Sequence, residues 1–206
     1  MQRYEKKTKL FRFFLYLCTM LILASQSPRR QALLKAMDLD FLVMAKPVDE
    51  TFPPSLRAEQ VAEYLAEKKA DAFDFAELPR DSTLIACDTT VILGNEILGK
   101  AATSDDAIAM LNKLSGRQHA VMTGVCIRTA TTKHCFSETT FVSFKPLTDE
   151  QIRHYVDRFK PFDKAGSYGI QEWIGMVGIA RIEGCYYNVM GLPTATLAEH
   201  LKHFFV

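Results

Sequence analysis

The chain has 206 residues, of which 48% are hydrophobic and 24% charged, and this suits one large globular domain or two small lobes with an ample core. Its 25 Lys and Arg residues balance 24 Asp and Glu residues, so no global field attracts nucleic acid or a membrane surface, and any anion binding must be local. Five cysteines without C-x-x-C spacing indicate buried thiols in a reducing compartment rather than a disulfide framework.

The N-terminal segment allows two interpretations. Four basic residues within positions 6–12 precede an uncharged run at residues 13–24, an order that is typical of a secretory signal. The run is too short for a membrane span, which needs about 20 apolar residues. The same pattern is typical of a buried first strand at residues 21–24 that leads into a helix, because Ser27 is a good N-cap and Pro28 suits the first helical position.

The first half of the chain predicts alternating strands and helices. We expect a helix over residues 28–37, a short strand at 41–45, and a helix over 58–75, where apolar residues recur at helical spacing. Residues 83–93 are so rich in apolar and β-branched side chains that they predict a central strand. A Gly-Asn turn then leads into a hairpin arm at residues 96–99.

The second half predicts both hairpin and crossover connections. The expected elements are a helix at 105–114, strands at 120–129 and 137–144, a helix after the Thr148 and Gln151 capping box, a hairpin of strands at 174–182 and 185–190, and a last helix at 194–204. Together the two halves predict an α/β fold with a mixed, twisted β-sheet and flanking helices.

Residues 25–30, SQSPRR, lie where the first strand meets the first helix. Free N–H groups at a helix start favour an anion, and two hydroxyls beside the guanidiniums of Arg29 and Arg30 suit phosphate oxygens. The alternative is an ordinary N-capped helix with two solvated arginines.

Asp88 interrupts the apolar central strand, where an ionised carboxylate is costly unless it is paired or bound to a metal. It is either catalytic or a carboxylate that accepts hydrogen bonds from loop amides. Glu50, Lys69 and Lys100 carry little signal alone, and the histidines lack the spacing of zinc ligands. The polar loop at residues 162–171, FDKAGSYGIQ, is either a connection or part of a site.

Six segments identify a family resemblance: LILASQSPRRQALL, ACDTTVIL, LGKA, LSGRQHAVMTGV, FDKAGSYGIQ and NVMGLP. In this order they resemble the Maf family of nucleoside triphosphate pyrophosphatases, from about residue 20 to the C-terminus. The resemblance implies a Maf/ITPase-like fold with two lobes around a deep cleft, usually as a homodimer. It also implies hydrolysis of a nucleoside triphosphate between its α and β phosphates, with a divalent metal cation, Mg²⁺ or Mn²⁺. The chain departs from the family at Ala101, where proline is usual.

The resemblance implies roles for two carboxylates and two lysines. Asp88 matches the proton acceptor that activates water. Glu50 matches the second acidic residue near the metal, so Glu50 and Asp88 are the implied metal ligands. Lys69 and Lys100 match lysines that face the triphosphate.

The remaining implied residues bind the substrate. Ser25, Arg29 and Arg30 lie in the loop that cradles phosphate, and Arg29, Thr89 and Gln171 match positions linked to substrate choice. The Tyr-Gly-Ile-Gln form of the loop resembles the branch that acts on dTTP and UTP. A side-chain amide is chemically suited to this choice, because it can pair with the donor–acceptor edge of uracil or thymine.

The resemblance also decides between the two N-terminal interpretations. Because LILAS is the buried first strand of this family, we expect an N-terminal extension at residues 1–19, a Maf-like domain at 20–206, and a cytoplasmic protein. The expected partner is a nucleoside triphosphate, with no nucleic acid and no membrane. A rival from another class is a nucleotide-sensing regulatory protein that affects septum formation and cell division, but the complete set of acidic and basic residues favours the enzyme.

Overall fold

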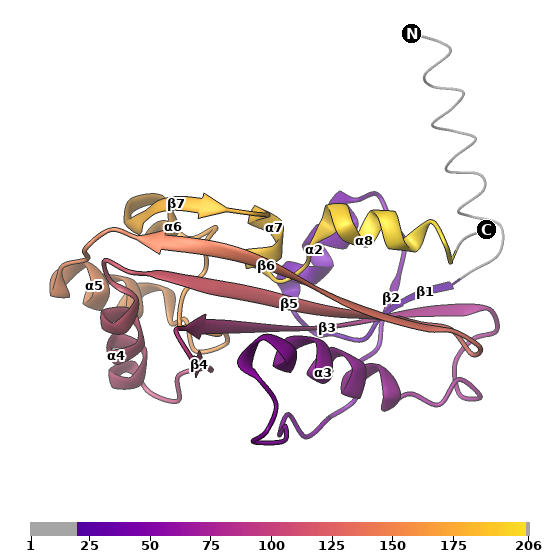
Figure 1. The fold of residues 1–206 in the computed structure, drawn as a ribbon. Helices are drawn as coiled ribbons and strands as arrows, with labels where there is room; N and C mark the ends of the chain where they lie inside the picture. Colours follow the sequence, from indigo (N-terminus) through magenta and orange to yellow (C-terminus); the bar gives the residue numbers. More distant parts are fainter. Residues whose placement is uncertain (1–19, 205–206) are drawn as a thin grey trace, which may run out of the picture.

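The computed structural model describes residues 20–204, which form one seven-stranded sheet flanked by helices (Figure 1). The strands are β1 (Met20–Leu23), β2 (Leu42–Val43), β3 (Ser82–Leu93), β4 (Glu96–Leu98), β5 (Gln118–Arg128), β6 (Lys133–Phe144) and β7 (Ile179–Glu183). The helices are α2 (Pro28–Ala36), α3 (Ala58–Asp71), α4 (Ser104–Leu114), α5 (Asp149–Phe159), α6 (Trp173–Gly178), α7 (Tyr186–Met190) and α8 (Thr194–Leu201). The predicted α/β class is confirmed.

The sheet contains both parallel and antiparallel pairs, as predicted. Its order is β2-β1-β3-β5-β6-β7, and β4 also pairs with β3. β1 is parallel to β2 and β3, whereas the other pairs are antiparallel. The strand predicted at residues 21–24 is confirmed as β1, whose last three residues are buried. The extension predicted at residues 1–19 lies outside the described residues.

β3 changes its neighbour partway along one edge. On this edge, residues 82–85 pair with β1 and residues 91–93 pair with β4. The opposite edge pairs with β5 from residue 84 to residue 92 without interruption. Within residues 20–204, no strand pairs with residues 86–90 on the first edge, so a rigid backbone borders an opening there.

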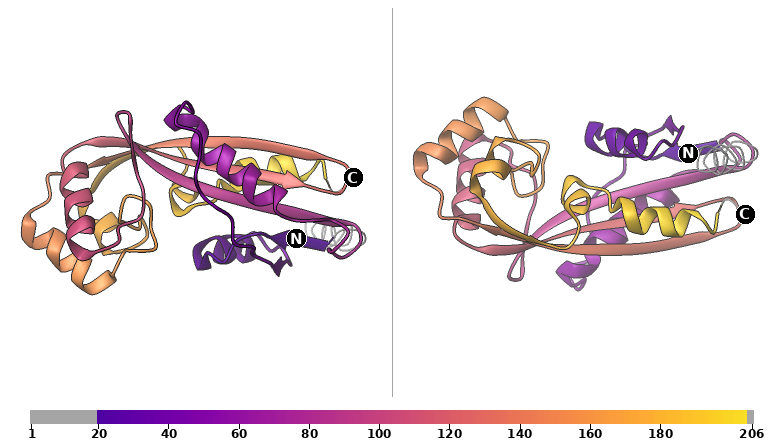
Figure 2. Two further views of the ribbon diagram at one scale, coloured as in Figure 1. Left: turned by 90° about the horizontal axis from the view of Figure 1, so that it is seen from below. Right: turned by 90° about the horizontal axis from the view of Figure 1, so that it is seen from above.

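The opening lies between two groups of helices along the long strands. Figure 1 shows α3 on one face of the sheet and α2 with α8 on the other, and each face has its own apolar cluster. α4, α5 and α6 gather at the far end (Figure 2), around a third cluster that includes Leu111, Tyr155 and Ile174. The two expected lobes are therefore present, and β3, β5 and β6 connect them.

Gly124 allows α3 to lie directly on β5. A Cβ atom at this position would be 2.3 Å from the carbonyl carbon and oxygen of Ala62 in α3. Any side chain there would push the helix away from the sheet, because backbone atoms, unlike a flexible side chain, cannot change rotamer to relieve the clash. The close approach fixes the depth at which the last turns of α3, which carry Lys69, lie over the sheet.

The predicted helix starts are confirmed. The Ser27 hydroxyl accepts a hydrogen bond from the Arg30 N–H at 3.5 Å, and Pro28 is the first residue of α2. Thr148 and Gln151 form the predicted capping box of α5. These features involve residues within one turn of each other, so their spacing in the sequence is sufficient to predict them.

The hairpin predicted over residues 174–190 is wrong. Its first arm is mostly helix α6, and only Ile179–Glu183 forms a strand, which pairs with β6. Its second arm is helix α7, which ends at Met190 and is capped by Gly191 with a left-handed φ of 112°. Short apolar runs do not distinguish strand from helix by periodicity. Packing of Ile174 into the core, where it is 1% exposed, favours the helix.

Elsewhere the differences concern the ends of elements. α3 ends at Asp71 rather than at 75, α8 ends at Leu201 rather than at 204, and β6 begins at Lys133 rather than at 137. The four cysteines among the described residues are free thiols, as predicted. None of the helices within residues 20–204 combines the length and the apolarity that crossing a bilayer requires.

The burial of His119 predicts a loss of stability in mild acid. Its ring is 2% exposed, Nε2 lies 2.7 Å from Tyr168 Oη, and burial lowers its pKa to about 4 from 6.5. Between these two pH values the unfolded chain binds a proton that the folded chain does not. The free energy of unfolding should therefore decrease as the pH falls through this range. The total decrease from above the higher pKa to below the lower one is roughly 3 kcal/mol.

Urea unfolding of the wild type and of His119→Gln, measured between about pH 4 and pH 7, checks this prediction. The glutamine variant can still hydrogen-bond Tyr168 but does not titrate, so its stability should decrease less in acid. An identical pH dependence in both proteins would contradict the assignment to His119.

Candidate active site

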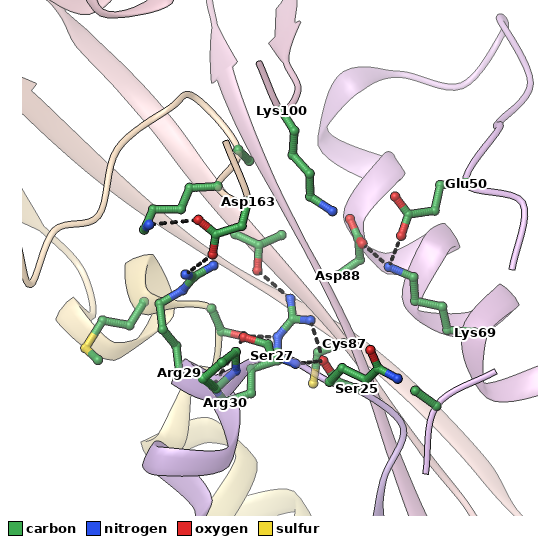
Figure 3. Close-up of a pocket in the computed structure, with 18 of the residues that line it drawn as sticks. Ser25, Ser27, Arg29, Arg30, Glu50, Lys69, Cys87, Asp88, Lys100 and Asp163 are labelled. Carbon is green, nitrogen blue, oxygen red and sulfur yellow. Dashed lines mark hydrogen bonds and ion pairs between the residues drawn. The ribbon is translucent and has the colours of Figure 1, made fainter. Parts of the chain in front are cut away.

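A cavity of about 760 Å³ opens beside the break along β3, between the two lobes (Figure 3). Its walls come from the β1–α2 loop, the segment after β2, α3, β3, the segment between β4 and α4, and the loop between α5 and α6. Every site residue predicted from the sequence lines it: Ser25, Arg29, Arg30, Glu50, Lys69, Asp88, Thr89, Lys100 and Gln171. Segments far apart in the sequence therefore meet at one place.

Asp88 and Thr89 are the two residues of β3 that are not fully buried. Consecutive residues of a strand point to opposite faces of the sheet. Asp88 lies opposite Gly124, on the face that α3 covers, whereas Thr89 lies opposite Thr123, on the face of α2. Each face therefore contributes one polar side chain from β3 to the cavity.

Lys69 bridges two carboxylates on the α3 face. Its Nζ lies 2.5 Å from Asp88 Oδ1 and 2.7 Å from Glu50 Oε1. The side chain of Asp88 is only 13% exposed, whereas that of Glu50 is 49% exposed. The hydrogen bond from Lys69, with the charges of Lys69, Lys100 and Arg30, lowers the pKa of Glu50 against the opposing effect of burial. Glu50 is therefore ionised at neutral pH.

Arg30 is held on the other face by neutral partners. Its Nε donates to the Gly191 carbonyl at 2.8 Å, and its terminal nitrogens donate to Ser25 Oγ at 3.2 Å and Thr89 Oγ1 at 3.0 Å. The Thr89 hydroxyl in turn donates to Thr123 Oγ1 at 2.9 Å, because the Thr123 hydroxyl donates to a backbone carbonyl. These partners fix the guanidinium without neutralising it, so its charge is available to an anion.

Arg29 forms an ion pair that the loop pattern did not predict. Its NH1 lies 2.7 Å from Asp163 Oδ2, and Lys164 Nζ lies 2.8 Å from Asp163 Oδ1. Although partial burial opposes it, hydrogen bonds from Lys164 and Arg29 lower the pKa of Asp163 to about 2. Asp163 and Lys164 both line the cavity. The sequence contains this adjacent pair, but no local signal indicates that it meets the start of α2.

Lys100 and Gln171 come from the second lobe. An isolated bridge between Lys100 and Ala165 ties the lysine to the loop that carries Gln171. The Lys100 ammonium points into the space between Asp163 and Asp88 (Figure 3), and it forms no ion pair within residues 20–204. Oε1 of Gln171 is buried without a hydrogen-bond partner among the described residues. Such an acceptor costs free energy unless a ligand or water satisfies it.

Cationic side chains outnumber carboxylates around the cavity. Six lysines and arginines line it, against three carboxylates, although the net charge of the whole chain is only +1. A partly shielded site with excess positive charge favours a polyanion, and guanidiniums and ammoniums hydrogen-bond phosphate oxygens well. The excess of positive charge is therefore local to this cavity, where the composition requires any anion binding to be local.

The two carboxylates beside Lys69 suit a hard divalent cation. Asp88 and Glu50 converge on one ammonium nitrogen, which shows that both can reach a single cationic centre. Within residues 20–204, no group of three or more His, Cys, Asp or Glu side chains could hold a metal. Mg²⁺ is usually bound by one or two carboxylates, water and substrate phosphates rather than by an all-protein cage. The residues fit that mode of binding.

The chain belongs to the Maf-like protein family, whose family model matches residues 20–204. A dTTP/UTP pyrophosphatase of Flavobacterium psychrophilum is 52% identical over 183 residues, which cover 89% of this chain and 93% of the relative. A dTTP/UTP pyrophosphatase of Porphyromonas gingivalis is 48% identical over 186 residues, which cover 89% of this chain and 94% of the relative. The resemblance found in the sequence motifs is confirmed.

A solved structure supports the fold at a greater evolutionary distance. The Staphylococcus aureus Ham1 protein superposes with a TM-score of 0.50 at 18% identity, covering 88% of this chain and 99% of the other. At this level of identity the likeness concerns the fold alone. It is consistent with the predicted Maf/ITPase-like architecture.

The geometry around Arg30 predicts that Arg30→Lys weakens anion binding about tenfold, because lysine cannot hold three directed hydrogen bonds and still face an anion. Isothermal titration of inorganic pyrophosphate measures the affinity. The control is Arg181→Lys on β7, where the arginine side chain is 71% exposed. Equal affinities of Arg30→Lys and the wild type would contradict the proposed anion site.

Proposed function

We propose that this protein hydrolyses pyrimidine nucleoside triphosphates, namely dTTP, UTP and modified uridine triphosphates, between the α and β phosphates. The products are the nucleoside monophosphate and pyrophosphate. The observation that carries this proposal is the position of Asp88, a shielded carboxylate paired with a lysine in a cavity with excess positive charge. The names of the relatives, dTTP/UTP pyrophosphatases, support the same reaction and substrates.

The triphosphate binds chiefly to Arg30 and Lys100, which form no ion pair with a carboxylate within residues 20–204. Arg30 and Lys100 face the phosphates from opposite lobes, and Ser25 and Arg29 belong to the same phosphate loop. Cleavage adds negative charge to the departing pyrophosphate. Contacts with these cations therefore strengthen toward the transition state, and this lowers the barrier rather than only tightening binding.

Asp88 acts as the general base. Its carboxylate accepts a proton from water while the water oxygen attacks the α-phosphorus, and the bond from that phosphorus to the bridging oxygen breaks. The bridging oxygen keeps the electron pair and leaves with pyrophosphate. Lys69 holds Asp88 at a defined position through the contact at 2.5 Å, and β3 keeps its backbone rigid.

A divalent cation, Mg²⁺ or Mn²⁺, would be held by Asp88 and Glu50. When bound, it supplies positive charge that offsets the charge developing on the phosphate oxygens. The lowered pKa of Glu50 keeps this ligand ionised at neutral pH, and the half-exposed position of its side chain leaves room for water and phosphate beside it.

Gln171 is the residue that selects the base. The edge of uracil or thymine presents the N3–H donor next to a carbonyl acceptor, and a glutamine amide presents the complementary pair. The buried Oε1 of Gln171 without a partner supports a role in ligand binding rather than in the fold. Arg29 and Thr89 are the other residues that we assign to substrate choice.

The nucleotide-sensing alternative is not favoured. A sensor could use the same cations, but it would not need a shielded carboxylate such as Asp88 beside the phosphates, and the relatives are named as enzymes. The homodimer and the cytoplasmic location that the resemblance implies stay predictions.

Asp88→Asn should retain the fold and lose about 10²- to 10⁴-fold in turnover, because asparagine keeps the shape of the side chain but cannot accept the proton. Pyrophosphate release from UTP in the presence of Mg²⁺ measures the rate, and circular dichroism checks the fold. Asp157→Asn, an exposed carboxylate on α5, is the matched control. Turnover near that of the wild type in Asp88→Asn would remove Asp88 from the mechanism.

A panel of triphosphates tests the proposed substrates. The wild type should release pyrophosphate from UTP and dTTP, and chelation of divalent cations should abolish this activity. Gln171→Ala should lower kcat/KM for both by about 10- to 100-fold while the affinity for inorganic pyrophosphate is retained, since the contact with the base is lost and the phosphate contacts are not. If a purine triphosphate such as 7-methyl-GTP is the best substrate of the wild type, the assignment to the branch that acts on dTTP and UTP is wrong.

A further inference from the structure

Glu172 follows the base-selecting glutamine directly but does not itself line the cavity. One of its carboxylate oxygens accepts a hydrogen bond from Tyr155 of α5, and the other lies 3.1 Å from Lys164 Nζ. Its side chain is only 20% exposed. A carboxylate with so little access to water needs these two partners, and they fix its position closely.

Tyr155 connects this carboxylate to the backbone of the loop. Its side chain is fully buried, and Oη accepts a hydrogen bond from the Gly169 N–H at 3.0 Å while it donates to Glu172. Burial and the adjacent Glu172 raise the pKa of the tyrosine, so at neutral pH its hydroxyl is protonated and can donate. Glu172 and the loop backbone are therefore held by one side chain of the α5 core.

The Glu172 carboxylate lies close to the Gln171 amide. A Cβ atom added to Gly169 would lie 2.9 Å from Glu172 Oε2 and 3.1 Å from Gln171 Nε2. The carboxylate oxygen and the amide nitrogen are therefore at most about 6 Å apart, and both lie beside Gly169, which has no side chain to separate them. A negative charge at this distance favours the amide orientation that turns its N–H₂ group toward the carboxylate and its oxygen away.

No hydrogen bond to Oε1 opposes a rotation of the Gln171 amide, since this atom has no partner within residues 20–204. The two orientations of an amide differ only by exchange of the donor and the acceptor. The two orientations therefore complement opposite patterns of donor and acceptor on a base. One complements uracil or thymine, and the other complements cytosine, which presents an acceptor at N3 and a donor at N4. The charge of Glu172 biases this choice.

We infer that Glu172 is a positioning residue that holds the Gln171 amide in one orientation and thereby makes the site select uracil and thymine nucleotides over cytosine nucleotides. The inference rests on the proposed function, in which Gln171 contacts the base. Glu172 acts through Gln171 and does not touch the substrate. Its ion pair with Lys164 and its hydrogen bond from Tyr155 keep the charge in the place where it can act.

The test compares UTP with CTP in the variant Glu172→Gln. The neutral amide can still accept the hydrogen bond from Tyr155, but it no longer carries the charge that orients Gln171. The ratio of kcat/KM for UTP to that for CTP should decrease about tenfold, which is the usual discrimination of a two-point amide contact. Most of the change should appear in KM, with kcat for UTP within about threefold of the wild type.

Two further variants separate positioning from a structural role. Tyr155→Phe removes two hydrogen bonds, the one that it donates to Glu172 and the one that it accepts from the Gly169 N–H, but it keeps the charge of Glu172. Its UTP to CTP ratio should therefore fall between those of the wild type and Glu172→Gln. Glu183→Gln on β7 makes the same change at a carboxylate that is 58% exposed and paired with Arg181, and it should leave the ratio unchanged. A purely structural role would lower the melting temperature and the active fraction without changing the ratio.

Calorimetric binding of α,β-methylene-UTP and α,β-methylene-CTP decides the inference without turnover. The inference is overturned if Glu172→Gln has the same UTP to CTP affinity ratio as the wild type. If Glu172→Gln does not fold, the Tyr155→Phe variant decides instead, and a folded Tyr155→Phe protein with the wild-type ratio overturns the inference. If the wild type binds the UTP analogue but releases no pyrophosphate from UTP, the proposed reaction fails, whereas the binding ratio still decides the role of Glu172.

Discussion

The change of neighbour along β3 is the structural constraint on which the site depends. β5 supports one edge of β3 from residue 84 to residue 92, while on the other edge β1 and β4 leave residues 86–90 without a partner strand in the described part of the chain. A further strand on this edge would occupy the space beside Asp88, and an ionised carboxylate without access to water carries a large desolvation cost. With one edge open, the carboxylate reaches the cavity while its backbone remains rigid.

Charge compensation divides the cavity into regions with different properties. Lys69 offsets part of the charge of Asp88 and Glu50 on the α3 face, whereas the partners of Arg30 among residues 20–204 are hydroxyls and a carbonyl. Near the loop before α6, carboxylates offset the cations that they contact. Excess positive charge therefore concentrates around Arg30 and Lys100, to which we assign phosphate binding. Because these groups are already held in place, they need little reorganisation when negative charge develops during cleavage.

Much of the fold could be predicted from the sequence because its signals are local. The Ser27 cap and Pro28 define the start of α2, and the β-branched run defines β3, since each depends on residues within a few positions of each other. The hairpin predicted over residues 174–190 failed for the opposite reason. Its short apolar runs suit either strand or helix, and contacts with distant residues in the core chose the helix.

The residues of the candidate site could be predicted from the sequence, but the contacts between them could not. Motifs identified Asp88, Arg30 and Gln171, and all three line the cavity. Nothing in the motifs indicated that Asp163 pairs with Arg29 or that Glu172 lies beside the Gln171 amide. The sequence by itself determined the family, the chemical groups and the elements that carry them, because these depend on residue type and short spacing. Only the tertiary structure decided which groups neutralise one another, because contacts between segments more than a hundred residues apart depend on how the sheet and its helices pack.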